Sequence, residues 1–377
     1  NYFEAGISVL DPDVSGQEAG TSATNRQIGD MAGDYYFPSA ALKLQPTKNF
    51  SFGILYDQPF GADAAYSGTN VFVSDATNTI LPPESLAVIR QNTINTTFNN
   101  LSAQQRVGAA LTARGVDLTT TAGQQAFQQT LTQYNTIAQV KAAIDAGVLA
   151  GVESAVDAGL ADVNGLLGTG NTKVEVDTQN LSFILGYQPT ENWNIYGGAV
   201  YQTIKGSVSL RGQAYSLYNG YDASIPEDSA VGWLAGFAYQ IPEIALKASL
   251  TYRSEVDHKV NVTESLSTLS ALALLPNGAE AAAAIAAASG ETNITTPQSV
   301  NLDFQTGIMA NTVAFANVRW VDWSNFSIRP YKFGLVSEAV GPLVSRPNGF
   351  NLVEYSDDQW SVTTGVGRKL NDQWAGN

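Results

Sequence analysis

The sequence predicts an all-β fold, a transmembrane antiparallel β-barrel with helical extracellular loop insertions. Three observations support this prediction: strict alternation of apolar and polar residues, short turns that alternate with long connections, and few charges. Charged residues make up 14% of the 377 residues, against the ~25% usual for soluble proteins, and the mean hydropathy is −0.06. These properties indicate strands with one apolar face toward lipid and one polar face toward the barrel interior.

Alternation with a period of two residues indicates a strand whose faces meet different environments. It is clearest in Ser299–Ile308, where Val300, Leu302 and Phe304 oppose polar neighbours. About ten strands are expected, at 1–10, 35–46, 49–58, 172–188, 192–211, 229–241, 244–264, 296–309, 312–328 and 357–370.

The connections between these strands alternate in length. Short turns are expected at Pro46–Asn49, Pro189–Asn192, Pro242–Glu243, Ala310–Thr312 and Asn371–Gln373. Long connections are expected at Pro59–Gly170, Gly212–Asp228, Glu264–Thr295 and Arg329–Asp357. This layout is typical of a bacterial outer-membrane barrel. The prediction is one incomplete barrel domain over residues 1–377, because the chain begins inside a strand and ends as another starts.

Two connections carry helical patterns. The long loop 62–170 contains Ser85–Leu167, where apolar residues recur at three-to-four spacing between Thr121 and Val156. A second helical insertion, Leu266–Ser289, lies within 265–295. Each insertion is either a lid that packs on itself or an apolar surface that captures a ligand.

Composition excludes several classes of function. The net charge of −15, without a cluster of Lys and Arg, argues against nucleic acid as a partner. The absence of Cys excludes thiolate chemistry, and a single His leaves little scope for a metal site. Catalytic motifs are missing, so the prediction is a protein that is not an enzyme and needs no cofactor. His258 is interpreted as an incidental polar residue.

Charged residues within the strands are expected to face the lumen, because a charge on the lipid face costs several kcal/mol near the midplane. Arg253 and Glu255 share one face of a strand, opposite Tyr252. They form either a structural ion-pair network or a site for an anionic head group. The same alternatives apply to other charged candidates, which are Lys43, Lys205, Lys247, Asp303 and Arg319.

A strand that begins near Asn49 reaches Pro59, Phe60 and Gly61. Proline cannot donate to a ladder, and both proline and glycine favour a bend or bulge. The segment is either the end of the strand or a kink that opens the wall.

Several stretches together resemble the FadL family of outer-membrane transporters of long-chain fatty acids and other hydrophobic compounds. The most specific is Thr251-Tyr252-Arg253-Ser254-Glu255-Val256. Weaker stretches are Ala5–Val14, Asn49–Gly61, Thr296–Ser299 and Trp320–Phe326. The resemblance implies a fourteen-stranded barrel with an N-terminal hatch, which would precede Asn1, and closing strands that would follow Asn377. The insertion Ser85–Leu167 is longer than the corresponding family loop.

The resemblance also implies a function. Ligands would be captured at the outer loops and would leave sideways through a kink in the third strand, where Pro59–Gly61 lies. We therefore expect passive uptake of long-chain fatty acids or other hydrophobic small molecules by a monomer in contact with outer-membrane lipid. The alternatives are a general porin for hydrophilic solutes and a structural or adhesive outer-membrane barrel.

Overall fold

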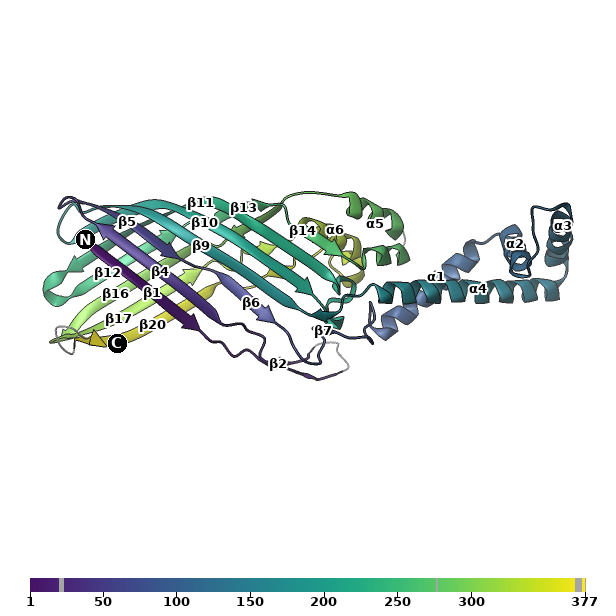
Figure 1. Cartoon of the computed structure of the whole chain (residues 1–377), viewed down its shortest axis with the longest axis horizontal. Coiled ribbons are helices and arrows are strands. Elements are labelled where there is room, and N and C mark those ends of the chain that lie inside the picture. The colour runs from purple at the N-terminus through teal and green to yellow at the C-terminus, as the bar shows by residue number, and fades with distance from the viewer. Residues whose placement is uncertain (20–23, 276, 370–374, 377) are drawn as a thin grey trace.

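The computed structural model describes residues 1–19, 24–275, 277–369 and 375–376. A curled sheet forms one end of the molecule, and a helical arm projects from the other (Figure 1). Both chain termini lie at the end of the sheet that is remote from the arm. The short turns join strands at this same end, so the long connections gather at the end that carries the arm. We refer to it as the long-loop end.

The curled sheet contains ten long strands in an antiparallel order that follows the chain, and the start of another strand extends it. These are β1 (Tyr2–Leu10), β4 (Tyr35–Leu44), β5 (Phe50–Asp57), β9 (Lys173–Tyr187), β10 (Trp193–Leu210), β11 (Tyr221–Ile241), β12 (Leu246–Arg253), β16 (Ser299–Met309), β17 (Thr312–Val321), β20 (Gln359–Lys369) and β21 (Ala375–Gly376). The prediction of about ten strands is confirmed. Residue 370 and the expected turn Asn371–Gln373 lie outside the described residues.

Three predicted boundaries are wrong. β17 ends at Val321, seven residues before the expected end at 328, and β18 (Ser327–Ile328) joins a different sheet. β11 begins at Tyr221, eight residues before the expected start at 229, and a register irregularity next to Pro226 lets the strand continue past this proline. The predicted strand 244–264 is not continuous. β12 ends at Arg253, and β13 (Val256–Val260) then joins a different sheet.

The outer face of the wall changes from apolar to polar along one line. In neighbouring strands Leu181, Tyr201 and Val231 form an apolar row, and the next outward row toward the long-loop end is Gln179, Thr203 and Ser229. The apolar side carries exposed side chains, among them Phe183, Leu185, Trp193, Ile195, Tyr201, Val231, Trp233 and Phe237. Outward apolar side chains over such a band are typical of a lipid-facing barrel wall.

A second sheet lies against the inner side of the wall at the long-loop end. It consists of β13, β15 (Thr292–Thr296), β18 (Ser327–Ile328) and β19 (Val353–Glu354). Val260 and Ile294 of this sheet pack on Ile204 and Ile225 of the wall in one buried cluster. Smaller strands complete the described set: β2 (Gly16–Gln17), β3 (Gln27–Ile28), β6 (Gly61–Ala65), β7 (Val73–Ser74), β8 (Gly170–Asn171) and β14 (Thr263–Leu266).

His258 fixes the second sheet to the wall, so its interpretation as an incidental residue is wrong. Its ring is fully buried, with Nδ1 2.9 Å from Asp228 Oδ2 and Nε2 3.0 Å from Gln202 Oε1. Thr296 donates to the same oxygen of Gln202 (2.7 Å). A buried imidazole requires such partners, because an unpaired polar group in the interior is costly.

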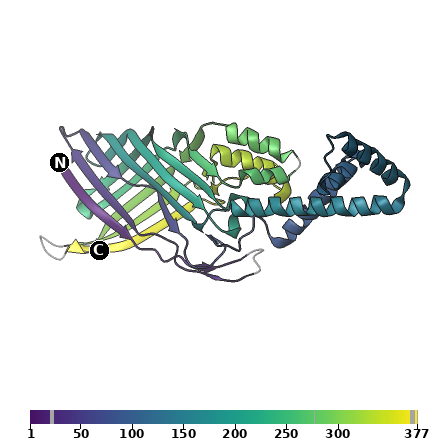
Figure 2. The ribbon, with the colours of Figure 1, turned by 45° about the vertical axis from the view of Figure 1, so that its right-hand side comes forward.

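The arm contains α1 (Pro83–Asn100), α2 (Ala103–Ala113), α3 (Thr121–Thr136) and α4 (Ala138–Gly165), and Figure 2 shows it standing clear of the sheet. It has its own core, in which Val107, Tyr134 and Ile144 are buried. Ser102 begins α2 with a capping box, so two backbone donors at the start of this helix are satisfied. Within the described part of the chain, no helix is long and apolar enough to span a membrane.

An ion network ties the tip of the arm together. Arg106 and Lys141 both contact the carboxylate of Asp145, and the hydroxyl of Tyr134 donates to it at 2.7 Å. Burial alone would raise the pKa of Asp145, but hydrogen bonds from Lys141, Tyr134 and Arg106 outweigh it and lower this pKa.

Shorter helices cover the long-loop end of the sheet. They are η1 (Gln213–Tyr218), η3 (Leu269–Leu274), α5 (Gly278–Ala287), α6 (Tyr331–Val340) and η4 (Gly341–Val344), while η2 (Pro242–Ile244) lies in a short turn. The sequence analysis does not predict α6, which falls inside the long connection Arg329–Asp357. These helices bury Tyr218, Leu272, Phe333 and Val336 in one apolar cluster with the ends of β10 and β11.

Candidate ligand-binding site

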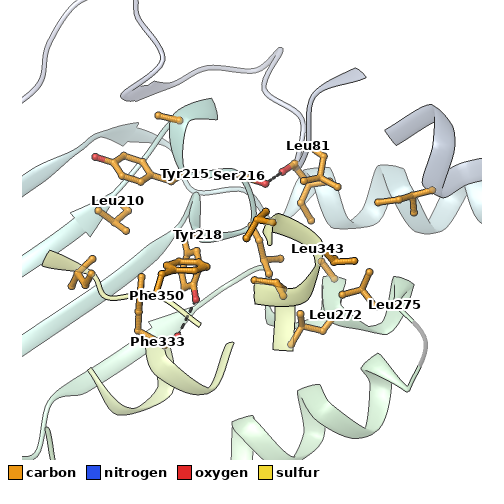
Figure 3. Close-up of a pocket in the computed structure, with 18 of the residues that line it drawn as sticks. Leu81, Leu210, Tyr215, Ser216, Tyr218, Leu272, Leu275, Phe333, Leu343 and Phe350 are labelled. Carbon is orange, nitrogen blue, oxygen red and sulfur yellow. Dashed lines mark hydrogen bonds between the residues drawn. The ribbon is translucent and has the colours of Figure 1, made fainter. Parts of the chain in front are cut away.

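A pocket of about 440 Å³ opens among the long connections (Figure 3). It is built by the start of the arm, η1, η3, α6 and η4, which are far apart in sequence. The lining is almost entirely apolar and aromatic, and includes Leu81, Leu86, Leu210, Tyr215, Leu217, Tyr218, Leu272, Leu275, Phe333, Leu343, Val344 and Phe350. In the described part of the chain, no charged side chain lines it.

The polar groups of the pocket are satisfied by the protein itself. Tyr218 stacks on Phe333 with 4.3 Å between ring centroids and donates its hydroxyl to the Phe333 carbonyl at 2.9 Å. Ser216 donates to the carbonyl of Ile80 at 2.5 Å. Burial raises the pKa of Tyr218, and it raises the pKa of Tyr215 to about 12, so both phenols are neutral. Such a pocket binds apolar surface and offers no counter-charge to an ion.

A second candidate site lies on the inner face of the wall. Asp57 ends β5 and Arg253 ends β12, and Nη1 of Arg253 lies 3.2 Å from Oδ2 of Asp57. β9, β10 and β11 separate these two strands in the sheet, so the ion pair crosses the inside of the curl. Arg319 of β17 interacts electrostatically with both, and its guanidinium lies 6.0 Å from the ring of Phe60. Phe60 also contacts the ring of Trp323 edge-on.

A one-residue bulge directs Phe60 inward. Asp57 pairs with Asn180 of β9, whereas Gly61 pairs with Asp177, so four steps on one side match three on the other. The extra residue reverses the alternation of faces, which leaves Asp57 and Phe60 on the same inner side. Thr178 fills the bulge: its hydroxyl accepts from the Phe60 amide at 3.1 Å and donates to the Phe60 carbonyl at 2.6 Å.

The predicted site residues separate into groups. Arg253 and Arg319 come together, and Pro59, Phe60 and Gly61 lie beside them at the interruption between β5 and β6. Asp303 and Lys247 are also inward, toward the short turns, where Asp303 accepts from Asn317 at 2.6 Å. Lys43 lies on the same inner side, in β4.

Two of the predicted site residues do not face the lumen. Lys205 lies on the outer face of β10, the same face as Tyr201, but beyond the apolar band. Its Nζ lies 3.7 Å from a carboxylate oxygen of Asp177. Glu255 is exposed in the break between β12 and β13, so it does not share a strand face with Arg253.

The sequence analysis missed Asp57, Trp323 and all of the apolar pocket. Asp57 had a usable signal, because it is the charged residue of its strand and lies on the face of Ser51, Gly53 and Leu55, opposite the more apolar face of Phe52, Ile54 and Tyr56. Within the described residues, no cluster of His, Asp and Glu could hold a metal ion.

An antiparallel curled wall with an apolar outer band, short turns at one end and an apolar pocket at the other defines an outer-membrane channel for hydrophobic compounds. The sequence pattern of the outer membrane protein transport protein family (OMPP1/FadL/TodX) matches residues 57–375, and the chain belongs to this family. The resemblance read from the sequence is thereby confirmed, and the protein is an outer-membrane protein of the kind that Gram-negative bacteria carry.

Several solved structures are similar to the chain. They include a Pseudomonas aeruginosa FadL homologue (12% identity, 99% of this chain and 68% of that one, TM-score 0.48) and the Ralstonia pickettii toluene transporter TbuX (10%, 99% and 74%, 0.47). A third is the Pseudomonas putida toluene transporter TodX (9%, 98% and 70%, 0.42). No curated protein sequence matches the chain.

Proposed function

We propose that the protein takes up long-chain fatty acids or other hydrophobic small molecules by passive diffusion, capturing them at the long-loop end and releasing them sideways into the membrane. The observation that carries the proposal is the apolar pocket at this end. Its lining exposes Leu343 and Val344 and contains no charge in the described part of the chain. A hydrophobic solute leaves water on entering such a pocket, which is favourable by about 25 cal/mol per Å² of apolar surface removed from water.

A gap in backbone pairing supports lateral release. β4 pairs with β5 as far as Ala40–Tyr56, and contact resumes at the bridge Ala32–Ala64. Among the described residues, 57–62 have no strand partner on the β4 side, which corresponds to ~20 Å of strand. Pro38 and Pro59 lie on either side of this gap and lack the N–H that a ladder needs. We call the gap the β4–β6 window.

The side chains at the window are aromatic. The rings of Tyr35 and Phe37 stack with 5.5 Å between centroids, and a Cβ added to Gly61 would lie 3.3 Å from the Tyr35 ring. Any larger residue at Gly61 would have to displace this ring. The small residue and the planar rings suit a slot through which a chain-like or flat apolar molecule slides. Because the pocket and the window both belong to one chain, we propose that the working unit is a monomer.

Uptake of labelled oleate by cells that carry the full-length gene, compared with cells that lack it, tests the function. We expect faster uptake with the gene and no change in sugar permeation. Unchanged oleate uptake together with increased sugar permeation would favour a general porin. Unchanged permeation of both solutes would favour a structural or adhesive barrel.

Lateral release has a separate test by cysteine crosslinking. The sequence contains no native cysteine, so only the introduced pair can react. If the register continued across the window, Pro38 would lie opposite Gln58. A Pro38→Cys/Gln58→Cys pair, joined by a reducible thiol crosslinker, should stop uptake until the link is reduced. The matched control is Ala40→Cys/Tyr56→Cys, a rung that is already paired, where the same link should leave uptake unchanged. Equal uptake with both links in place would exclude the window as the exit.

A further inference from the structure

Asp57, Arg253 and Arg319 form a half-buried charge cluster inside the barrel wall, which among the described residues holds two cations and one carboxylate. The side chains of Arg253 and Asp57 are only 24% and 28% exposed. Like charges at short range disfavour each other where little water screens them, so a single carboxylate leaves this cluster with an excess of positive charge.

Hydrogen bonding in the cluster is incomplete. Among the residues that the structure describes, Nη1 of Arg253, Nε of Arg319 and Oδ1 of Asp57 are buried atoms without a hydrogen-bond partner. The contact between Arg253 and Asp57 is therefore an ion pair without the alignment of a good hydrogen bond. Buried donors of this kind are normally satisfied, and a second oxyanion between the two guanidinium groups would satisfy both of them.

The position of Asp57 links this cluster to the wall. Asp57 is the last residue of β5, and the bulge and the β4–β6 window begin directly after it. On the β9 side, the bulge is held at Phe60 by Thr178. The ion pair to Arg253 therefore ties this end of β5 to the opposite side of the curl, next to the place where the wall has no ladder.

We propose that a ligand carboxylate binds between Arg253 and Arg319 in place of Asp57, and that the exchange frees the end of β5 beside the β4–β6 window. The inference rests on the proposed uptake function and names ionised long-chain carboxylic acids as the ligands of this site. Neutral hydrocarbons have no group that could replace Asp57. Their passage consequently leaves the ion pair in place.

Binding of oleate and of oleyl alcohol to the full-length protein in lipid nanodiscs tests the exchange, because the two ligands differ only in the head group. Arg253→Gln should weaken oleate binding about tenfold or more, the range expected for a lost charge-assisted hydrogen bond, and should leave oleyl alcohol unchanged. Asp57→Asn should strengthen oleate binding, since the competing carboxylate is gone.

Control variants separate this site from general effects. Arg368→Gln removes another cation of the wall, at the opposite end of β17 from Arg319, and should change neither ligand. Arg253→Lys retains the charge without the guanidinium fork and should give an intermediate affinity for oleate. Equal losses for oleate and oleyl alcohol in Arg253→Gln would overturn the exchange. Acetate that competes as well as oleate would overturn the assignment of a long-chain ligand.

Amide hydrogen exchange tests the coupling to the wall. Oleate should speed exchange at the amides of Asp57, Gln58, Phe60 and Gly61, and oleyl alcohol should not. Unchanged protection with bound oleate would refute the release of β5, even if the carboxylate binds. A wild-type protein that binds oleyl alcohol and shows no carboxylate preference would refute the exchange site alone. A protein that binds neither ligand would refute the proposed uptake function as well.

Discussion

Leu185 provides a direct measurement of where the membrane meets the wall. Its side chain is 68% exposed on the outer face of β9, between Phe183 and Tyr187. Gln179 lies on the same strand and the same face, in the first polar row beyond the apolar band. We compare Leu185→Arg with Gln179→Arg, which introduce the same charge at two depths.

The expected difference follows from the geometry of the strand. Six residues separate the two positions, which at ~3.3 Å per residue and a tilt of ~40° gives about 15 Å along the membrane normal. The apolar band of such barrels is ~25 Å tall, so it extends ~12 Å to either side of its middle. With Leu185 near the middle of the band, Gln179 at ~15 Å lies outside it. Leu185→Arg should therefore reduce the free energy of unfolding by about 2–4 kcal/mol, and Gln179→Arg by about 0–1 kcal/mol.

Guanidinium unfolding of the full-length protein in phospholipid bilayers, followed by tryptophan fluorescence, gives both values. The same pair measured in a detergent with a short chain should show a smaller difference, because water reaches the charge more easily. Equal costs at the two positions in bilayers would refute the placement of the membrane boundary at the row of Leu181 and Tyr201.

Other predictions concern the loops, the arm and the bulge. Gly212 has φ of +98°, and an added Cβ would lie 2.2 Å from the Val71 carbonyl, so Gly212→Ala should lower the free energy of unfolding in urea by about 1–3 kcal/mol. Gly147→Ala, in an open part of α4, should instead raise it by up to ~1 kcal/mol. The lowered pKa of Asp145 adds stability to the arm above the unfolded pKa near 3.8, and this stability is lost as pH falls through the folded pKa. Circular dichroism at acid pH should therefore show helix loss in the wild type and a flatter pH response in Asp145→Asn. Thr178→Val should cost about 1–3 kcal/mol and speed amide exchange at Phe60, because both hydrogen bonds of the Thr178 hydroxyl to Phe60 are lost.

The strands that sequence predicts well are those in which alternation and environment agree. β16 alternates from Ser299 to Phe304, and β9 and β10 alternate on the short-turn side of the row of Leu181 and Tyr201, because there one face meets lipid and the other the lumen. Alternation could not reveal the break after Arg253. Even-numbered residues are apolar in β12, where they face outward, and in β13 the even-numbered Val256 and Val260 are again apolar but are buried inside, with the buried His258 between them. The pattern continues unchanged while the chain leaves the wall.

The prediction that charges point inward has a limit set by the membrane. It holds for Arg253 and Arg319, which lie in the wall. It fails for Lys205, which lies past the apolar rows, where an outward charge meets water and costs little. The register between strands shows where the lipid-facing band ends, because it aligns the polar residues of neighbouring strands into one row. The sequence of a single strand does not show this row.

The pocket was invisible for a different reason. Tyr218 and Phe333 lie 115 residues apart, and their stacking depends on how four long connections fold over one another. Local periodicity carries no information about such contacts, because each connection is irregular by itself. Helices in the arm were predicted, since α3 and α4 build their own core from residues close in sequence.

The arm leaves and rejoins the sheet at nearly the same place. The Ile80 amide donates to Oδ1 of Asn164 at 3.1 Å, and Ile80 packs with Val163, so the two ends of the helical segment are fastened to each other. A segment with joined ends and a private core can be lengthened, shortened or exchanged without shifting the register of any neighbouring strand. The arm is therefore a modular insertion, which can be replaced as a unit while the strands of the wall keep their pairing.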